Sequence, residues 1–218
     1  MKTTNTFYRD ITKTGAIAGI TSIVCYFSVA VIPIIPDKIA LMVAFAFPLM
    51  WLISFMGLYQ FLKNQHHTAS LEIAYIFGII GAALACILLV IQQANIIWDT
   101  ELQSSANYES MKDFYSATFR GANRVQAGLD VAFDIFITIS WILFGLNIAR
   151  NKSFNKIFGW LGSTIALGLL VLNMITFPDA PAESGLFDLG PFLGIWTLIF
   201  YIWFLVVVLK SEKAHLKE

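Results

Sequence analysis

The sequence predicts an all-α membrane protein built as a bundle of six transmembrane helices. Six long apolar stretches, separated by short polar ones, fill most of the 218 residues. Hydrophobic residues make up 58% of the chain and charged residues 13%, whereas soluble domains carry about 25% charged residues. Six spans of about 20 residues each use more than half of the length. We therefore expect one integral membrane domain over residues 1–218.

The six spans are assigned from the apolar runs. Each run is long enough to cross a hydrocarbon core of about 30 Å at a rise of about 1.5 Å per residue. The segment before the first run is polar and the run itself is long, which is unlike a cleavable signal peptide. In chain order the expected spans are Gly15–Ile35, Ile39–Leu62, Ile73–Trp98, Val125–Ala149, Ile157–Phe177 and Gly190–Leu209.

The distribution of lysine and arginine predicts that both termini lie in the cytoplasm. With that orientation the inner segments hold ten of the 14 basic residues and the outer segments hold four, as the positive-inside rule requires. The segment from Pro178 to Leu189 carries three acidic residues and no basic one, which suits the outer face. An odd number of spans would place the two basic ends of the chain on opposite sides.

One sizeable outer loop, Asp99–Arg124, is expected between the third and fourth spans. Within it Tyr108, Met111, Tyr115 and Phe119 follow the spacing i, i+3, i+7 and i+11. This pattern is typical of a short amphipathic helix that lies on the membrane surface. Such a helix is either a lid over the bundle or a plain amphipathic connector, and the sequence leaves both interpretations open.

Polar side chains inside the spans gather in the outer half of the predicted bundle. Two aspartates lie four residues apart on the fourth span, so they share one helical face. Amides lie near the outer ends of the third and fifth spans, and one further aspartate directly precedes the sixth. This polar layer comprises Gln92, Asn95, Asp130, Asp134, Asn173 and Asp188.

The cost of burying charge indicates where the two aspartates of the fourth span must point. A carboxylate at mid-membrane depth costs at least about 2.5 kcal/mol, so Asp130 and Asp134 are expected to face the bundle interior. There the amides of the layer supply hydrogen bonds, and Arg120 or Arg124 neutralises the upper acid. The layer then forms an outward-facing acidic pocket for a small cationic or protonatable ligand. The alternative is a non-catalytic structural or accessory protein, in which the layer only locks helix packing.

Small residues at helix-packing spacing recur along the chain. In membranes such pairs let two helix backbones approach closely. They serve contacts within the bundle, or contacts with a second copy or a membrane partner. The pairs are Gly15 with Gly19, Gly162 with Ala166, and Gly190 with Gly194.

Residues of the kind that carry catalysis or bind metals are not arranged for it in this sequence. The three histidines, His66, His67 and His215, fall in segments assigned to the cytoplasm, opposite the acidic layer. We therefore expect no catalytic residue, no metal site and no cofactor, and an intramembrane hydrolase is the least favoured class. The formal net charge is zero, so no basic surface for nucleic acid is expected. Cys25 and Cys86 lie inside spans and are expected to pack as small apolar residues.

Several short segments in the second half of the chain are similar to a known group of proteins. They are Gly128–Asp134, Lys156–Gly162, Leu172–Asn173, Thr176–Pro178 and Gly185–Pro191. Together they resemble an uncharacterised family of bacterial six-helix integral inner-membrane proteins of unknown function. The resemblance implies a multi-pass protein of the bacterial plasma membrane, and it carries no catalytic residue over to this chain.

Overall fold

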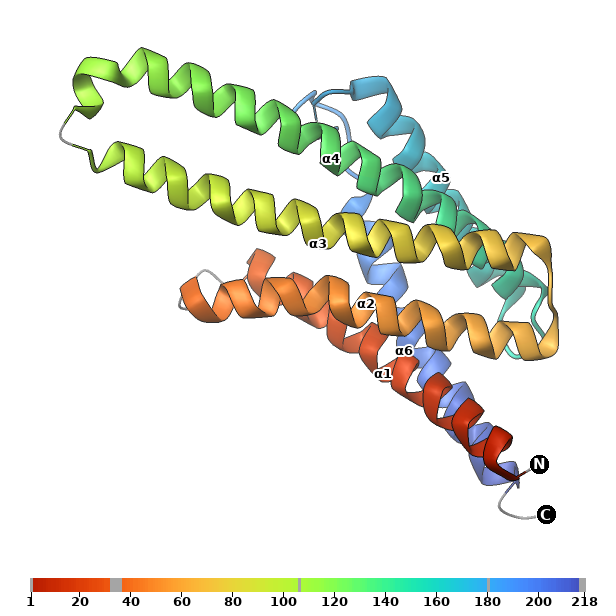
Figure 1. The fold of residues 1–218 in the computed structure, drawn as a ribbon. Helices are drawn as coiled ribbons and strands as arrows, with labels where there is room; N and C mark the ends of the chain where they lie inside the picture. Colours follow the sequence, from red (N-terminus) through yellow and green to blue (C-terminus); the bar gives the residue numbers. More distant parts are fainter. Residues whose placement is uncertain (1, 32–36, 106, 180, 216–218) are drawn as a thin grey trace.

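The fold is all-helical in the part of the chain that the structure describes. The structure is a computed structural model that describes residues 2–31, 37–105, 107–179 and 181–215. Within these residues six α-helices follow one another (Figure 1). They are α1 (Lys2–Val31), α2 (Asp37–Gln65), α3 (Ala69–Gln103), α4 (Tyr108–Arg150), α5 (Lys156–Thr176) and α6 (Gly190–His215).

Five of these helices, α2 to α6, are long and apolar enough to cross a membrane. The predicted spans 39–62, 73–98, 125–149, 157–177 and 190–209 fall on them to within one residue. The first predicted span, 15–35, begins inside α1, and its residues 32–35 lie outside the described residues. The protein is therefore a multi-pass membrane protein.

Local signals in the sequence explain where several helices begin and end. The hydroxyl oxygen of Thr68 accepts a hydrogen bond from the backbone N–H of Leu71 and caps α3, and Asn155 caps α5 in the same way. These side chains satisfy N–H groups that the first helical turn leaves free. Pro178 follows the end of α5 by two residues, where its ring disfavours further helix.

The six helices pack as a ring in chain order. Each helix packs on the next one, and α1 closes the ring against α6. The start of α1 and the end of α6 lie at the same end of the ring, together with the α2–α3 and α4–α5 turns (Figure 1). We call this end the terminal end, and the end with the α3–α4 turn the distal end.

Glycines allow the closest helix crossings within the ring. A Cβ added to Gly15 on α1 would lie 2.5 Å from the Cα of Gly57 on α2. One added to Gly19 would lie 2.3 Å from the ring of Tyr201 on α6, and one at Gly162 would meet the ring of Trp196. The predicted small-residue faces on α1 and α5 are thus covered by other helices of the same chain. Contact with a second copy stays a prediction.

Aromatic side chains from α2, α4 and α6 fill the terminal half of the ring. Trp141 on α4 is fully buried, and its ring centroid lies 5.5 Å from that of Phe55 and 5.4 Å from that of Trp196. These contacts cross the ring and hold helices that are not neighbours in the chain. We call this set the aromatic core, and it comprises Phe55, Trp141, Phe144, Trp196, Phe200 and Tyr201.

The segment 99–124, predicted as a loop, is almost entirely helical. Residues up to Gln103 continue α3, and α4 begins at Tyr108 and runs unbroken to Arg150. No proline lies between Pro48 and Pro178, so no residue in this stretch forces a helix to end. The two helices continue as an antiparallel pair beyond the rest of the ring (Figure 1). The 43 residues of α4 span about 65 Å at about 1.5 Å per residue.

The residues expected to form a helix on the membrane surface belong to this helical pair instead. Trp98 near the end of α3 packs against Phe119 of α4, with ring centroids 6.2 Å apart. The rings of Tyr108 and Tyr115 stack along α4 itself, also 6.2 Å apart. The i, i+3, i+7 and i+11 spacing correctly predicted a helix. Phe119 on the apolar face of that helix packs against α3.

Candidate functional site

A cavity of about 810 Å³ occupies the distal half of the ring. All six helices and the loop between α5 and α6 contribute to its lining. Along α4 it extends from Arg120 to Ile137, which is about 25 Å at about 1.5 Å per residue. The next residues on that face, Trp141 and Phe144, are fully buried members of the aromatic core. The core therefore closes the cavity toward the terminal end.

Five of the six residues of the predicted polar layer line this cavity: Gln92, Asp130, Asp134, Asn173 and Asp188. The sixth, Asn95, does not line it. Its side-chain amide donates a hydrogen bond to Gln126 across 2.9 Å, and Gln126 lies in the cavity lining. The layer thus brings α3, α4, α5 and the start of α6 together around one space.

Asp134 is held in place by a hydrogen bond from α5. Its Oδ2 accepts this bond from the Nδ2 of Asn173 across 2.8 Å. Asn173 is 6% exposed, so this pair is shielded, while Asp134 itself is half-buried. The hydroxyl of Thr138, one turn further along α4, donates a hydrogen bond to the backbone carbonyl of Asp134. One carboxylate oxygen of Asp134 is therefore engaged by the protein.

Asp130 lies one helical turn closer to the distal end and is exposed to the cavity. The sequence predicts that Arg120 or Arg124 neutralises this acid, but neither arginine forms an ion pair with it among the described residues. The guanidinium of Arg124 instead pairs with Asp179 in the α5–α6 loop, with 2.7 Å between Nη1 and Oδ1. No ion pair to Asp130 or Asp134 is formed by the described residues. Within the described part of the chain, these two acids therefore face the cavity without a cationic partner.

Acidic side chains outnumber basic ones in the lining. Asp130 and Asp134 lie deepest along α4, while the other charged groups lie on its distal part and on the α5–α6 loop. Over the described lining, five carboxyl groups stand against two guanidinium groups. Its carboxylates are Asp130, Asp134, Asp179, Glu183 and Asp188, and its guanidinium groups are Arg120 and Arg124.

Asp188 has a structural role besides its place in the lining. Its Oδ1 accepts a hydrogen bond from the backbone N–H of Gly190 across 2.8 Å. That N–H belongs to the first turn of α6, where no intrahelical acceptor is available. Asp188 therefore caps α6, and its capping role alone would explain an aspartate at this position.

The lining also contains an aromatic wall that sequence reasoning missed. Tyr26 of α1, Phe47 and Trp51 of α2, and Phe133 of α4 all line the cavity. Successive ring centroids along the wall lie 5.2, 4.9 and 6.2 Å apart. Trp51 is 6% exposed, and its indole N–H has no hydrogen-bond partner in the described part of the chain. The available signal was the i, i+4 spacing of Phe47 and Trp51, which places both on one face.

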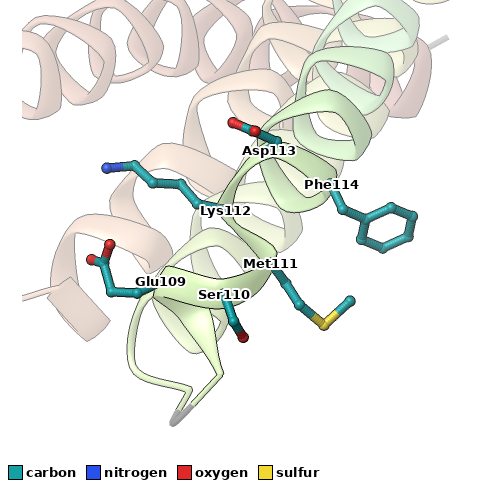
Figure 2. A pocket seen from close by; sticks show the side chains of 6 residues that line it. All are labelled: Glu109, Ser110, Met111, Lys112, Asp113 and Phe114. Atoms are coloured by element: carbon teal, nitrogen blue, oxygen red, sulfur yellow. The ribbon is translucent and has the colours of Figure 1, made fainter.

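A second hollow lies at the start of α4, and it does not form a site of this kind. Figure 2 shows its six side chains, all from consecutive residues between Glu109 and Phe114. They point away from the helix in different directions, with Lys112 and Phe114 on opposite sides. Because a binding site needs polar groups that converge, this hollow is the surface around one helix end.

Polar residues at the terminal end join α2 to α3. The hydroxyl of Tyr59 donates to Glu72 across 2.6 Å, and the ammonium of Lys63 donates to Tyr59 across 2.7 Å. His67 also contacts the Glu72 carboxylate, so it is a partner in this network. Among the described residues no group of three or more His, Cys, Asp or Glu side chains is placed to hold a metal ion. Cys25 and Cys86 are both free.

Comparison with known proteins gives one match. The family model described as "Domain of unknown function (DUF4386)" matches residues 38–207. No curated protein and no solved structure matches the chain. The matched segment begins at the start of α2, so it includes α2 and α3 as well as the second half in which the resemblance was seen. It also includes every residue of the polar layer and most of the aromatic wall.

Proposed function

This chain belongs to the DUF4386 family, a domain of unknown function, and we propose its function from its own residues. We propose that its cavity binds a small cationic or protonatable ligand. The observation that carries this proposal is the excess of carboxylates in one cavity of about 810 Å³. Cavities of about 300–1,000 Å³ with a few convergent polar groups are typical small-molecule sites.

The position of Asp130 and Asp134 supports a cation over an anion or a neutral ligand. The two carboxylates lie one turn apart on α4 and line the same space. Acidic residues inside membrane spans are costly and usually have a partner. Described side chains supply only an amide, from Asn173 to Asp134. A bound cation would supply the missing positive charge.

The proposed setting is a bacterial plasma membrane, with six spans and both termini in the cytoplasm. The ratio of ten inner to four outer basic residues supports this orientation. The start of α1 and the end of α6 lie at the same end of the ring in Figure 1, which agrees with an even number of spans. In this orientation the distal end faces outward, so the cavity receives its ligand from outside the cell.

We propose that the protein binds its ligand and does not catalyse a reaction on it. Asp130 and Asp134 share one helix, whereas a pair of catalytic aspartates in a membrane needs facing helices. The aromatic core closes the cavity toward the terminal end. A ligand in this conformation enters and leaves through the distal side, and carriage across the membrane would require the aromatic core to rearrange.

The test is direct binding of ammonium ions to the purified full-length protein in detergent. Tetramethylammonium and methylammonium are titrated calorimetrically into wild type, into the double variant Asp130→Asn/Asp134→Asn, and into Asp113→Asn. The double variant keeps the shape of both side chains but not their charge, so at least tenfold weaker binding is expected. Asp113 lies on the same helix outside the cavity, so its variant should bind like wild type. Equal affinity in all three proteins would show that the proposal is wrong.

A second candidate function is structural. Asp134 is already bonded to Asn173 and Asp188 already caps α6, which favours a layer that only locks the helices of an accessory membrane protein. That reading predicts that Asp130→Asn is silent and that Asp130→Leu lowers stability. Measuring ammonium binding and thermal stability on the same two variants separates the candidates, because a ligand site loses affinity already with Asp130→Asn.

A further inference from the structure

The cavity has two chemically unlike walls. Among the described residues, every carboxylate and guanidinium group in the lining comes from α4 or from the α5–α6 loop. The described residues that α1 and α2 contribute are Ile23, Tyr26, Phe47 and Trp51. The division follows from the ring, because α1 and α2 lie on one side of it and α4 with α5 on the other. Most of the aromatic surface therefore comes from α1 and α2 and faces the charged groups across the same space, while Phe133 extends it onto α4 beside the acids.

A small hydrophilic cation would contact the acids but would use only part of the cavity. A metal ion or methylammonium held between Asp130 and Asp134 would leave most of the 810 Å³ filled with water against the aromatic wall. Water beside apolar surface is unfavourable, and burying that surface against an apolar group is favourable. Aromatic faces also attract organic cations, most strongly at tryptophan.

From these two observations we infer that the ligand is an amphiphilic organic cation, a lipophilic ammonium or phosphonium compound with a bulky apolar body. Its charged centre lies at Asp130 and Asp134, and its apolar body lies on the aromatic wall formed by Tyr26, Phe47, Trp51 and Phe133. This inference rests on the proposed function and narrows it from any cation to cations with a large apolar surface.

The experiment compares three probes on full-length protein in lipid nanodiscs, with empty nanodiscs as the blank for partition into lipid. Tetraphenylphosphonium is the bulky cation, tetramethylammonium is the small cation, and triphenylphosphine oxide is the neutral aromatic compound. We expect tetraphenylphosphonium to bind at least tenfold more tightly than tetramethylammonium. Triphenylphosphine oxide should bind at least tenfold more weakly than tetraphenylphosphonium because it lacks the charge.

Variants assign the two parts of the ligand to the two walls. Trp51→Leu should weaken tetraphenylphosphonium at least fivefold and leave tetramethylammonium within twofold of wild type, while Trp51→Phe keeps an aromatic ring and should retain most of the affinity. Trp160 on α5 is 50% exposed and lies outside the cavity lining, so Trp160→Leu is the matched control. Should Trp51→Leu not fold, Tyr26→Leu tests the same wall at a residue that is 47% exposed.

The possible outcomes distinguish a failure of the amphiphile inference from a failure of the proposed cation binding. If the two cations bind with equal affinity, and the aromatic-wall variants change neither, the amphiphile inference is overturned while the cation site stands. If no cation binds, or if Asp130→Asn/Asp134→Asn binds both cations like wild type, the proposed function fails and the inference with it. If the neutral probe binds as tightly as tetraphenylphosphonium, the charge has no part in recognition and both are overturned.

Discussion

The side chain of Asn173 on α5 donates a hydrogen bond across 2.8 Å to the carboxylate of Asp134 on α4. The two residues are 39 positions apart in the chain, and the contact exists only because α4 and α5 pack as neighbours in the ring. It orients one of the two central acids of the cavity. The same contact serves the structure and positions the candidate site.

Removing the donor of this bond should destabilise the protein. Asn173→Leu leaves the half-buried Asp134 carboxylate without its partner, and an unsatisfied group of this kind costs about 1–3 kcal/mol. We expect the free energy of unfolding, measured by titration with sodium dodecyl sulfate, to fall by that amount. Thr176→Val on the same helix removes only a hydroxyl that bonds within its own turn, and should change stability by less than about 0.5 kcal/mol. Equal stability of the two variants would contradict this role for Asn173.

One substitution, glycine to alanine, should have opposite effects at two positions. A Cβ at Gly15 would lie 2.5 Å from the backbone of Gly57, so Gly15→Ala forces α1 and α2 apart at a cost of about 1–3 kcal/mol. At Gly121 on α4 a Cβ meets no described atom within 4 Å, so Gly121→Ala should stabilise the helix by about 0.5–1 kcal/mol. The measurement is again the detergent-unfolding free energy. A Gly15→Ala variant as stable as wild type would show that α1 does not cross α2 this closely.

The aromatic core should account for a large share of the stability. Trp141 is fully buried and touches rings from α2, α4 and α6, so Trp141→Ala should cost about 3–5 kcal/mol. Trp160→Ala removes the same side chain from the outside of α5, where it is 50% exposed, and should cost about 0.5 kcal/mol or less. Comparing thermal unfolding midpoints of the two variants checks the prediction. A similar loss in both would mean that the core is not the stabilising centre of the ring.

The proposed topology predicts which turns face outward. In a Cys25→Ser/Cys86→Ser background, single cysteines are placed at Ser104 in the α3–α4 turn or at Lys152 in the α4–α5 turn, both exposed. A membrane-impermeant maleimide applied to intact spheroplasts should label Ser104→Cys, and should label Lys152→Cys only after permeabilisation, because the basic segments lie inside. The reverse pattern would invert the proposed orientation. Labelling of both turns from outside would contradict a membrane between them.

The helices of this protein were predictable because membrane spans are read directly from the length of apolar runs. The predicted span 157–177 and the observed α5, Lys156–Thr176, differ by one residue at each end. The segment 99–124 was not predictable in this way. Its polar residues resemble a loop, but polar residues are compatible with a helix, and no proline interrupts the segment. In the structure α3 and α4 simply continue as a helical pair beyond the other helices.

The acidic half of the candidate site was predictable and the aromatic half was not. Polar residues are rare in membrane spans, so Gln92, Asp130, Asp134 and Asn173 stand out in the sequence, and their depth places them together. Apolar and aromatic residues are the ordinary content of a span. Nothing in the composition separates Trp51, which lines the cavity, from Trp160, which lies on the outside of α5.

By itself the sequence determined that the chain is an all-helical membrane protein and that the acids inside its spans lie in one layer, because both follow from local composition and from the cost of charge in lipid. Tertiary structure alone decided which apolar faces meet. It closed α1 against α6, filled the terminal half of the ring with the aromatic core, and left the distal half open between the acids of α4 and the aromatic wall. Packing among apolar helices is set by side-chain shape, since lipid and protein are equally apolar there. Whether the shapes of two distant segments fit each other cannot be predicted from the sequence of either segment alone.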